Sequence, residues 1–231
     1  MDGHPRQDPA YGLLQKGPSV QLDEGPFHCG AARRRVLRYA PRMRPTAAQM
    51  AASLGLEPHP EGGFYLETYR AACTLQTPRG ERPASTAIIF LVTAGSVSKL
   101  HRLTSDELWV FQGGLPLEIV TIAPDGEPQR RVLGDLEEIV RSRVYGDEPS
   151  AESPVGSPEG SLDWLSQALV PAGCWQGARL AGGLQLPAQY AWALVSCVVT
   201  PGFDFADFEL GERDALLAEF PEHAELVREL T

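Results

Sequence analysis

Short segments with the alternation of β-strands recur along the chain from residue 64 onward. Phe64–Arg70 and Ser96–Leu103 alternate between apolar and polar side chains, and Thr86–Thr93 is continuously apolar, as in a strand buried on both faces. The remaining strand-like segments are Glu107–Gln112, Leu115–Ile122, Ala168–Val170, Arg179–Leu186 and Tyr190–Val199. Strands about ten residues apart, separated by Gly and Pro turns, predict an all-β barrel or sandwich.

Helical patterns flank these strands on both sides. Thr46 is a predicted N-cap for a helix over Ala47–Leu54, which Gly55 would end. Near the C-terminus, Glu212–Phe220 has a helical pattern, and Pro221 suits the first turn of a second helix. The expected fold is therefore mostly β, with short helices at both ends.

A single domain with appendages accounts for the length. Residues 1–44 are rich in Pro, Arg and Gly and show no sustained period, so we expect a disordered N-terminal extension before a domain over residues 45–231. We interpret the basic run at residues 33–35 as solvated rather than as a nucleic-acid or targeting arm. Within the domain, the polar stretch Asp147–Gly160 predicts a mobile insertion at about residues 135–163.

Charge and composition narrow the range of partners. The net charge of −10 argues against nonspecific binding to nucleic acid or to an anionic membrane, because both need a basic face. No apolar run reaches the roughly 18 residues of a spanning helix. The four cysteines form no C-x-x-C pair, as is typical of a reducing compartment. We therefore expect a cytoplasmic protein with a small-molecule ligand.

The most informative stretch of the sequence is Gly95–Gly114. It reads Gly, five residues, His101, one residue, Leu103, three residues, Glu107, six residues, Gly. Residues 101 and 103 point to the same side of a strand because side chains alternate. A tight turn at residues 104–106 then lets Glu107, on the next strand, face the same cavity.

This spacing resembles the first motif of the cupins, except that Leu103 stands where the second histidine is usual. The segment Pro171–Gln176 resembles the second motif, P-x-G-x-x-His, with Gln176 at the histidine position. The positions that hold the metal in metal-binding cupins therefore read His101, Leu103, Glu107 and Gln176.

Only two of these four side chains are good metal ligands. Catalytic first-row metal sites usually have three protein ligands, so we expect no cofactor here. A divalent metal, if one is bound, would be held by His101, Glu107 and Gln176. His59 is the only evident replacement ligand, provided that its loop folds over the mouth of the barrel.

Resemblance to one branch of the superfamily covers most of the chain. From about Leu54 to the C-terminus, the sequence is similar to the uncharacterised cupin family five. The blocks that carry this similarity are HPEGGFYLETYR (59–70), STAIIFLVT (85–93), HRLTSDELW (101–109), VPAGCWQGARL (170–180) and PGFDFADFELGERDALLAEFPEH (201–223). The resemblance implies a cupin jelly-roll barrel, a homodimer and a ligand-sized pocket.

Candidate roles follow from position and residue type. His101 and Glu107 are the predicted catalytic pair, because a buried carboxyl has a raised pKa and can act as an acid or base near neutrality. The predicted ligand-binding residues are Gln176, Trp109, Phe111 and Tyr65. We expect the segment Gly202–Phe208 to dock on the barrel, with its aspartates capping or pairing.

The first functional hypothesis is a metal-independent isomerase, epimerase or lyase acting on a small polar or sugar-like molecule. The alternative is a binding module that holds a small ligand without turnover. A metal-dependent dioxygenase is a third possibility, which Leu103 and Gln176 disfavour. The sequence does not name the ligand.

Overall fold

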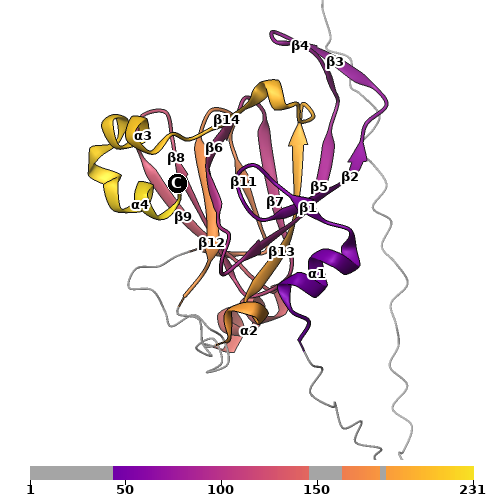
Figure 1. Cartoon of the computed structure of the whole chain (residues 1–231), viewed down its shortest axis with the longest axis vertical. Helices are drawn as coiled ribbons and strands as arrows, with labels where there is room; N and C mark the ends of the chain where they lie inside the picture. Colours follow the sequence, from indigo (N-terminus) through magenta and orange to yellow (C-terminus); the bar gives the residue numbers. More distant parts are fainter. Residues whose placement is uncertain (1–43, 146–162, 183–185) are drawn as a thin grey trace, which may run out of the picture. The chain divides into compact units, whose positions relative to one another are not determined.

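The computed structural model describes residues 44–145, 163–182 and 186–231 (Figure 1). Residues 1–43 of the predicted N-terminal extension (1–44) and most of the predicted insertion lie outside these residues. The first part of the insertion is described, and it contains the helix α2 (Leu136–Tyr145).

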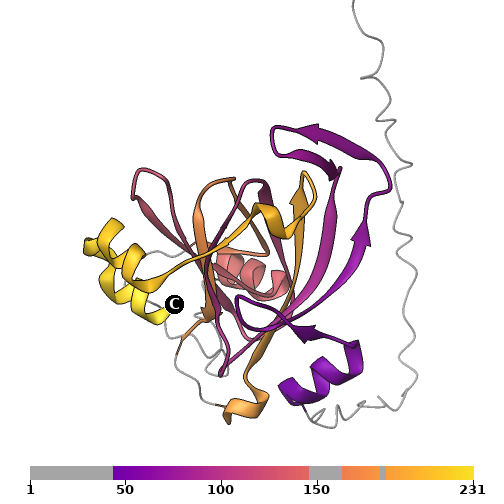
Figure 2. The same cartoon turned by 45° about the horizontal axis from the view of Figure 1, so that its top comes forward.

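Two six-stranded sheets make up the domain (Figures 1 and 2). In order across the first sheet, the strands are β1 (Glu57–Pro58), β2 (Phe64–Arg70), β5 (Thr86–Thr93), β13 (Trp192–Thr200), β7 (Asp106–Gly114) and β11 (Gln167–Val170). Across the second sheet they are β10 (Asp163–Leu165), β9 (Pro128–Leu133), β8 (Leu117–Ile122), β12 (Trp175–Leu180), β6 (Ser98–Leu103) and β14 (Phe208–Leu210). This arrangement confirms the prediction of an all-β cupin-like jelly roll.

The main core lies between the two sheets. Phe90 and Val92 of β5 and Trp109 of β7 pack there against Leu117 and Ile119 of β8. These side chains alternate along their strands, so one face of each sheet supplies the interior.

The outer face of the second sheet is covered by the C-terminal helices α3 (Arg213–Glu219) and α4 (Ala224–Glu229) (Figure 2). Val120 and Ile122, which alternate with the inward residues of β8, pack there against Leu216 and Val227. Both faces of β8 are therefore buried, which explains its continuously buried pattern. The 3₁₀ turn η3 (Pro221–His223) joins the two helices.

The helix α1 (Ala47–Leu54) has the predicted bounds. The Thr46 side chain accepts a hydrogen bond from the backbone N–H of Gln49, and the Gln49 side chain accepts one from the backbone of Thr46. Gly55 ends the helix in the left-handed conformation. Local capping chemistry alone determines these ends, so the sequence was enough to locate them.

Other predicted boundaries need correction. The strand expected at Arg179–Leu186 is β12, Trp175–Leu180, because the chain enters the sheet directly after the turn at residues 171–174. The sequence did not reveal β9, β10, β14 or the hairpin of β3 (Thr74–Thr77) and β4 (Gly80–Pro83). The hairpin residues are mostly exposed, so they lack the apolar alternation that marks a strand. Two further 3₁₀ turns, η1 (Ala188–Tyr190) and η2 (Phe205–Asp207), precede β13 and β14.

Among the described helices, none has both the length and the apolar character needed to cross a lipid bilayer.

The turn at residues 59–63 leads the chain into β2 and against the opposite sheet. The N–H of His59 donates to the carbonyl of Gly63 at 3.1 Å, and the N–H of Gly62 donates to the carbonyl of His59 at 3.0 Å. Gly62 has a φ of +108°, and a Cβ there would lie 2.1 Å from the carbonyl oxygen of Val97. Only glycine fits this close approach without moving the backbone.

We expect Gly62→Ala to lower the free energy of unfolding by about 2–5 kcal/mol, because it adds backbone strain and a clash with Val97. Urea denaturation measures the change. Gly95→Ala is the control, since a Cβ at Gly95 meets nothing within 4 Å and Gly95 has no positive φ. An equally small effect of both substitutions would contradict this account of the turn.

Candidate functional site

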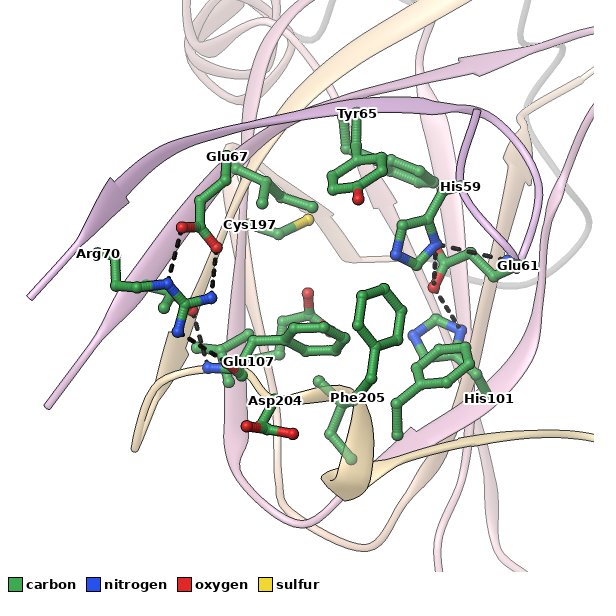
Figure 3. A pocket seen from close by; sticks show the side chains of 17 residues that line it. His59, Glu61, Tyr65, Glu67, Arg70, His101, Glu107, Cys197, Asp204 and Phe205 are labelled. Carbon is green, nitrogen blue, oxygen red and sulfur yellow. Dashed lines mark hydrogen bonds and ion pairs between the residues drawn. The ribbon is translucent and has the colours of Figure 1, made fainter. Parts of the chain in front are cut away.

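A cavity of about 260 Å³ lies inside the barrel and opens beside the segment that precedes β14 (Figure 3). His59, Glu61, His101 and Glu107 are among its polar side chains. Apolar walls come from both sheets and from the segment 203–208, namely Ile88, Phe90, Leu103, Val199, Phe203, Phe205 and Phe208.

His101 lies on β6 and is almost fully buried. Its Nδ1 is 2.8 Å from the carbonyl oxygen of Lys99, and a carbonyl oxygen only accepts hydrogen bonds. Nδ1 therefore carries the proton, which leaves the lone pair of Nε2 toward the cavity (Figure 3). Burial lowers the pKa of His101, while Glu107 and the bond to Lys99 act in the opposite direction.

Glu107 is the second residue of β7, in the sheet opposite His101. Its Oε2 accepts a hydrogen bond from Nε2 of Gln176 at 2.5 Å, and the thiol of Cys197 also interacts with the carboxyl. Burial raises the pKa of Glu107 to about 7, against the opposing effect of His101. The sequence-predicted pair is thus brought to one cavity, with Glu107 able to exchange a proton near neutral pH.

Glu61 is the site residue that the sequence analysis missed. Its side chain is buried, with Oε1 accepting a hydrogen bond from the Ser98 hydroxyl at 2.8 Å. Its Oε2 lies 3.2 Å from Nδ1 of His101 and 3.5 Å from Nδ1 of His59. Burial raises the pKa of Glu61 to about 8, although the bond from Ser98 opposes the shift.

The sequence held one weak signal for Glu61. Glu61 directly precedes the pair Gly62–Gly63, and both glycines adopt positive φ. A double glycine permits a close approach of two backbones, and here that approach delivers the preceding side chains into the barrel.

His59 faces the cavity from the same turn, as was expected only if its loop folded over the mouth. Its Nδ1 lies 3.4 Å from the backbone N–H of Glu61, which can only donate. Burial, together with a smaller effect of the nearby His101, lowers the pKa of His59 to about 4. The ring packs edge-on against Tyr65, with the ring centres 4.7 Å apart.

Of the four predicted ligand-binding residues, the structure places Tyr65 in the cavity lining. Gln176 lies behind Glu107, where its Oε1 accepts a hydrogen bond from Nε1 of Trp109 at 3.0 Å. Trp109 belongs to the core between the sheets, and Phe111 packs against that core. Within the described residues, these three side chains lie outside the lining of the cavity, and two of them support Glu107.

The segment before β14 docks on the barrel as expected. Asp207 is buried and pairs with Arg82 through two hydrogen bonds of 2.7 and 3.1 Å. Asp204 caps the next turn by accepting from the N–H of Ala206 at 2.8 Å. These polar anchors hold Phe205 and Phe208 over the cavity, and the Phe208 ring stacks on His101 at 5.5 Å between centres.

An ion pair stands on the side of the cavity away from the histidines (Figure 3). Arg70 binds both carboxylate oxygens of Glu67, at 2.8 and 2.6 Å. Its remaining nitrogen donates to the carbonyl of Phe203 at 3.3 Å. The pair is partly exposed, so it orders the mouth more than it stabilises the fold.

The donor set does not fit the metal of metal-binding cupins. Leu103 presents hydrocarbon at one of the four positions, and the amide of Gln176 is held between Trp109 and Glu107. Within residues 44–145, 163–182 and 186–231, no three or more His, Cys, Asp or Glu side chains are grouped to hold a metal ion. Two imidazoles and two carboxyls remain, with Glu61 in contact with both imidazoles, a set suited to proton transfer and hydrogen bonding.

Comparisons with known proteins agree with the fold. The sequence profile described as "Cupin superfamily (DUF985)" matches residues 48–211. Among curated proteins, none matches this chain. A solved structure of a hypothetical protein from Leishmania major is 32% identical with a TM-score of 0.64, and the match covers 80% of this chain and 98% of that one.

A crystal structure of a protein from Shewanella oneidensis is 36% identical with a TM-score of 0.60, covering 80% of this chain and 97% of that one. Oxalate decarboxylase from Bacillus subtilis is 14% identical with a TM-score of 0.40, covering 76% of this chain and 37% of that one. A similarity as distant as the last says nothing about function.

We expect protein purified without an affinity tag to contain far less than one metal ion per chain, because its site offers too few free ligands. Elemental analysis measures the content. Leu103→His is the matched variant, since it adds an imidazole two residues from His101 and should raise metal affinity. Stoichiometric iron, manganese, nickel or zinc in the unaltered protein would contradict the expectation.

We expect the free energy of unfolding to fall as the pH rises from 6.5 to 8. The native state keeps protons on Glu61 and Glu107 up to pKa values of about 8 and 7, whereas the unfolded chain loses them near the ordinary pKa of 4.5. The native state therefore binds more protons in this window, and each carboxyl contributes a slope of up to about 1.4 kcal/mol per pH unit.

Urea denaturation at several pH values measures this slope. The window begins at 6.5 because below it the lowered pKa of His59 has the opposite effect on stability. Glu61→Gln should flatten the curve between pH 7 and 8, whereas Glu67→Gln, at the exposed ion pair, should leave it unchanged. A curve that rises with pH in this window would refute the assignment of buried neutral carboxyls.

Proposed function

This chain belongs to the cupin superfamily (DUF985), and we propose that it is an enzyme that moves a proton within a small polar molecule without a metal ion. The reaction class is that of an isomerase, epimerase or lyase. The observation that carries the proposal is the buried pair of His101 and Glu107, facing one cavity from opposite sheets.

His101 has the features of a general base. Its Nδ1–H is fixed by the carbonyl of Lys99, so the free lone pair belongs to Nε2 at the cavity. Burial lowers the pKa of His101, which keeps the ring neutral and ready to accept a proton. A proton removed from a bound molecule would pass to Nε2, and the imidazolium formed would be stabilised by the nearby carboxyl of Glu107.

Glu107 fits the complementary role. Its pKa of about 7 means that both protonation states are accessible at neutral pH. Gln176 and Trp109 form a hydrogen-bonded chain behind the carboxyl, which fixes its orientation. Glu107 is therefore placed either to stabilise the charged His101 or to act as the acid.

The cavity limits what can bind. Its volume of about 260 Å³ lies just below the usual range of ligand pockets, which favours a small molecule. Aromatic rings of Tyr65, Phe205 and Phe208 line it and offer faces for a sugar or another ring.

The alternative function is a binding module that holds such a molecule without turnover. The observation that favours it is that the Glu107 carboxyl already has two partners, Gln176 and Cys197. A carboxyl held in this way can orient a ligand without taking part in chemistry.

We expect the protein to catalyse the exchange of carbon-bound hydrogen next to a carbonyl group in D₂O. NMR follows the loss of the proton signal, with hydroxyacetone and pyruvate as probes. His101→Ala and Glu107→Gln should each lower the rate about 100-fold, as is typical for the loss of acid–base catalysis. Glu67→Gln is the control at the mouth of the same cavity.

Thermal melting of each variant confirms that the fold is retained. A probe that binds in the cavity without any exchange would favour the binding module and contradict the enzyme. Exchange that persists in both the His101 and Glu107 variants would exclude these residues as its source.

A further inference from the structure

One carboxyl oxygen joins the two histidines of the cavity. Oε2 of Glu61 lies 3.2 Å from Nδ1 of His101 and 3.5 Å from Nδ1 of His59. The other oxygen of Glu61 accepts from Ser98. In Figure 3 the second nitrogen of each ring turns toward the interior of the cavity.

The remaining contacts assign the protons of the two rings. Nδ1 of His101 faces the carbonyl of Lys99 and must donate to it, so Nε2 of His101 is bare. Nδ1 of His59 faces the backbone N–H of Glu61 and must accept from it, so a neutral His59 carries its proton on Nε2. The two imidazoles therefore have opposite tautomers.

A protonated Glu61 satisfies both neighbours at once. The hydroxyl at Oε2 donates to Nδ1 of His59, an acceptor that it shares with the longer contact from the backbone N–H. It also accepts from the Nδ1–H of His101, which is shared with the carbonyl of Lys99. An ionised carboxylate could only accept, and it would draw the proton of His59 to Nδ1. The pKa of about 8 caused by burial agrees with the protonated form at neutral pH.

We propose that Glu61 is a positioning residue that holds His101 and His59 in opposite tautomers, so that the cavity offers a bound molecule one imidazole acceptor and one imidazole donor. His59 is then the second catalytic residue, and the ligand is a neutral α-hydroxy aldehyde or ketone. The roles in catalysis rest on the proposed function above, whereas the tautomers do not.

The proton transfers balance. The proton on the carbon next to the carbonyl passes to Nε2 of His101, and Nε2–H of His59 gives its proton to the carbonyl oxygen. Nδ1 of His59 receives the proton of Glu61 in the same step. The products are an enediol, a neutral His59, and an ion pair between the imidazolium of His101 and the carboxylate of Glu61 at the 3.2 Å contact.

The same geometry selects a neutral ligand. A carbonyl oxygen matches the donor at His59, and an adjacent hydroxyl matches Tyr65, whose own hydroxyl group points into the cavity (Figure 3). An anionic ligand would lie between two buried carboxyls, Glu61 and Glu107, and would be repelled by whichever of them is ionised.

The decisive experiment is ¹⁵N NMR of the full chain labelled at the histidine rings, at neutral pH. His59→Gln and His101→Gln assign the signals, since each removes one ring. We expect His101 protonated on Nδ1 and His59 on Nε2. Both rings with the same tautomer would overturn the proposal.

Glu61→Gln separates positioning from proton transfer. Its amide can donate to His59 through nitrogen and accept from Ser98 through oxygen, while the carbonyl of Lys99 still accepts from Nδ1–H of His101, so both tautomers should persist. The amide cannot release a proton to His59, so exchange into hydroxyacetone should fall about 100-fold. A switch of the His59 tautomer in this variant would show that Glu61 is ionised and would refute its role.

Two further measurements test the positioning by Glu61 and the ligand class separately. Glu61→Ala removes the carboxyl and leaves only the 3.4 Å contact from the backbone N–H of residue 61 to hold His59, so the Nε2–H tautomer should lose population. Thermal melting checks the folding, and an unchanged His59 tautomer would show that the backbone alone fixes it and would count against positioning by the Glu61 side chain. Hydroxyacetone should bind at least tenfold more tightly than pyruvate, and the reverse order would overturn the neutral ligand class. Opposite tautomers without any exchange in the unaltered protein would refute the proposed enzyme while the positioning by Glu61 stands.

Discussion

The cost of placing ionisable groups inside an apolar barrel governs this site. Glu61, Glu107 and His101 are all buried, and the walls around them are mostly aromatic and aliphatic. Burial disfavours the charged form of each group, so the pKa values of the carboxyls rise to about 8 and 7 while that of His59 falls to about 4. The two carboxyls would be fully ionised in water at neutral pH, and their raised pKa values allow them to exchange protons there.

The fold supplies these groups from separate elements. His101 comes from the second sheet, Glu107 from the first, and Glu61 from a turn in which Gly62 allows the close approach to Val97. Each side chain also has one fixed partner outside the cavity: Lys99 for His101, Gln176 for Glu107 and Ser98 for Glu61. The site is therefore held by the two sheets and by this outer layer of hydrogen bonds.

Sequence reasoning found what depends on local pattern. The caps of α1 and the apolar strands were predictable because capping and alternation involve near neighbours. The pairing of His101 with Glu107 followed from motif spacing. Glu61 escaped because its partners are distant in sequence, with Ser98 37 positions away, and because HPEGG reads equally well as a surface turn. The shielded place of Gln176, behind Glu107, likewise depends on contacts across the two sheets.

Leu103 and Gln176 stand where the two cupin motifs usually have histidines, and this replacement changes the electrostatics of the site. A bound cation would favour ionised carboxyls and bare imidazoles, because a metal ion is the largest local charge in such a site. With Leu103 in one ligand position, the neighbourhood of His101 gains hydrocarbon in place of a donor. With Gln176 in the other, Glu107 gains a neutral hydrogen-bond donor in place of a competing ligand. Without that cation, burial keeps the pKa of Glu107 raised even though the hydrogen bond from Gln176 opposes the shift. A barrel with protons to move has a route to acid–base chemistry that depends on its own side chains.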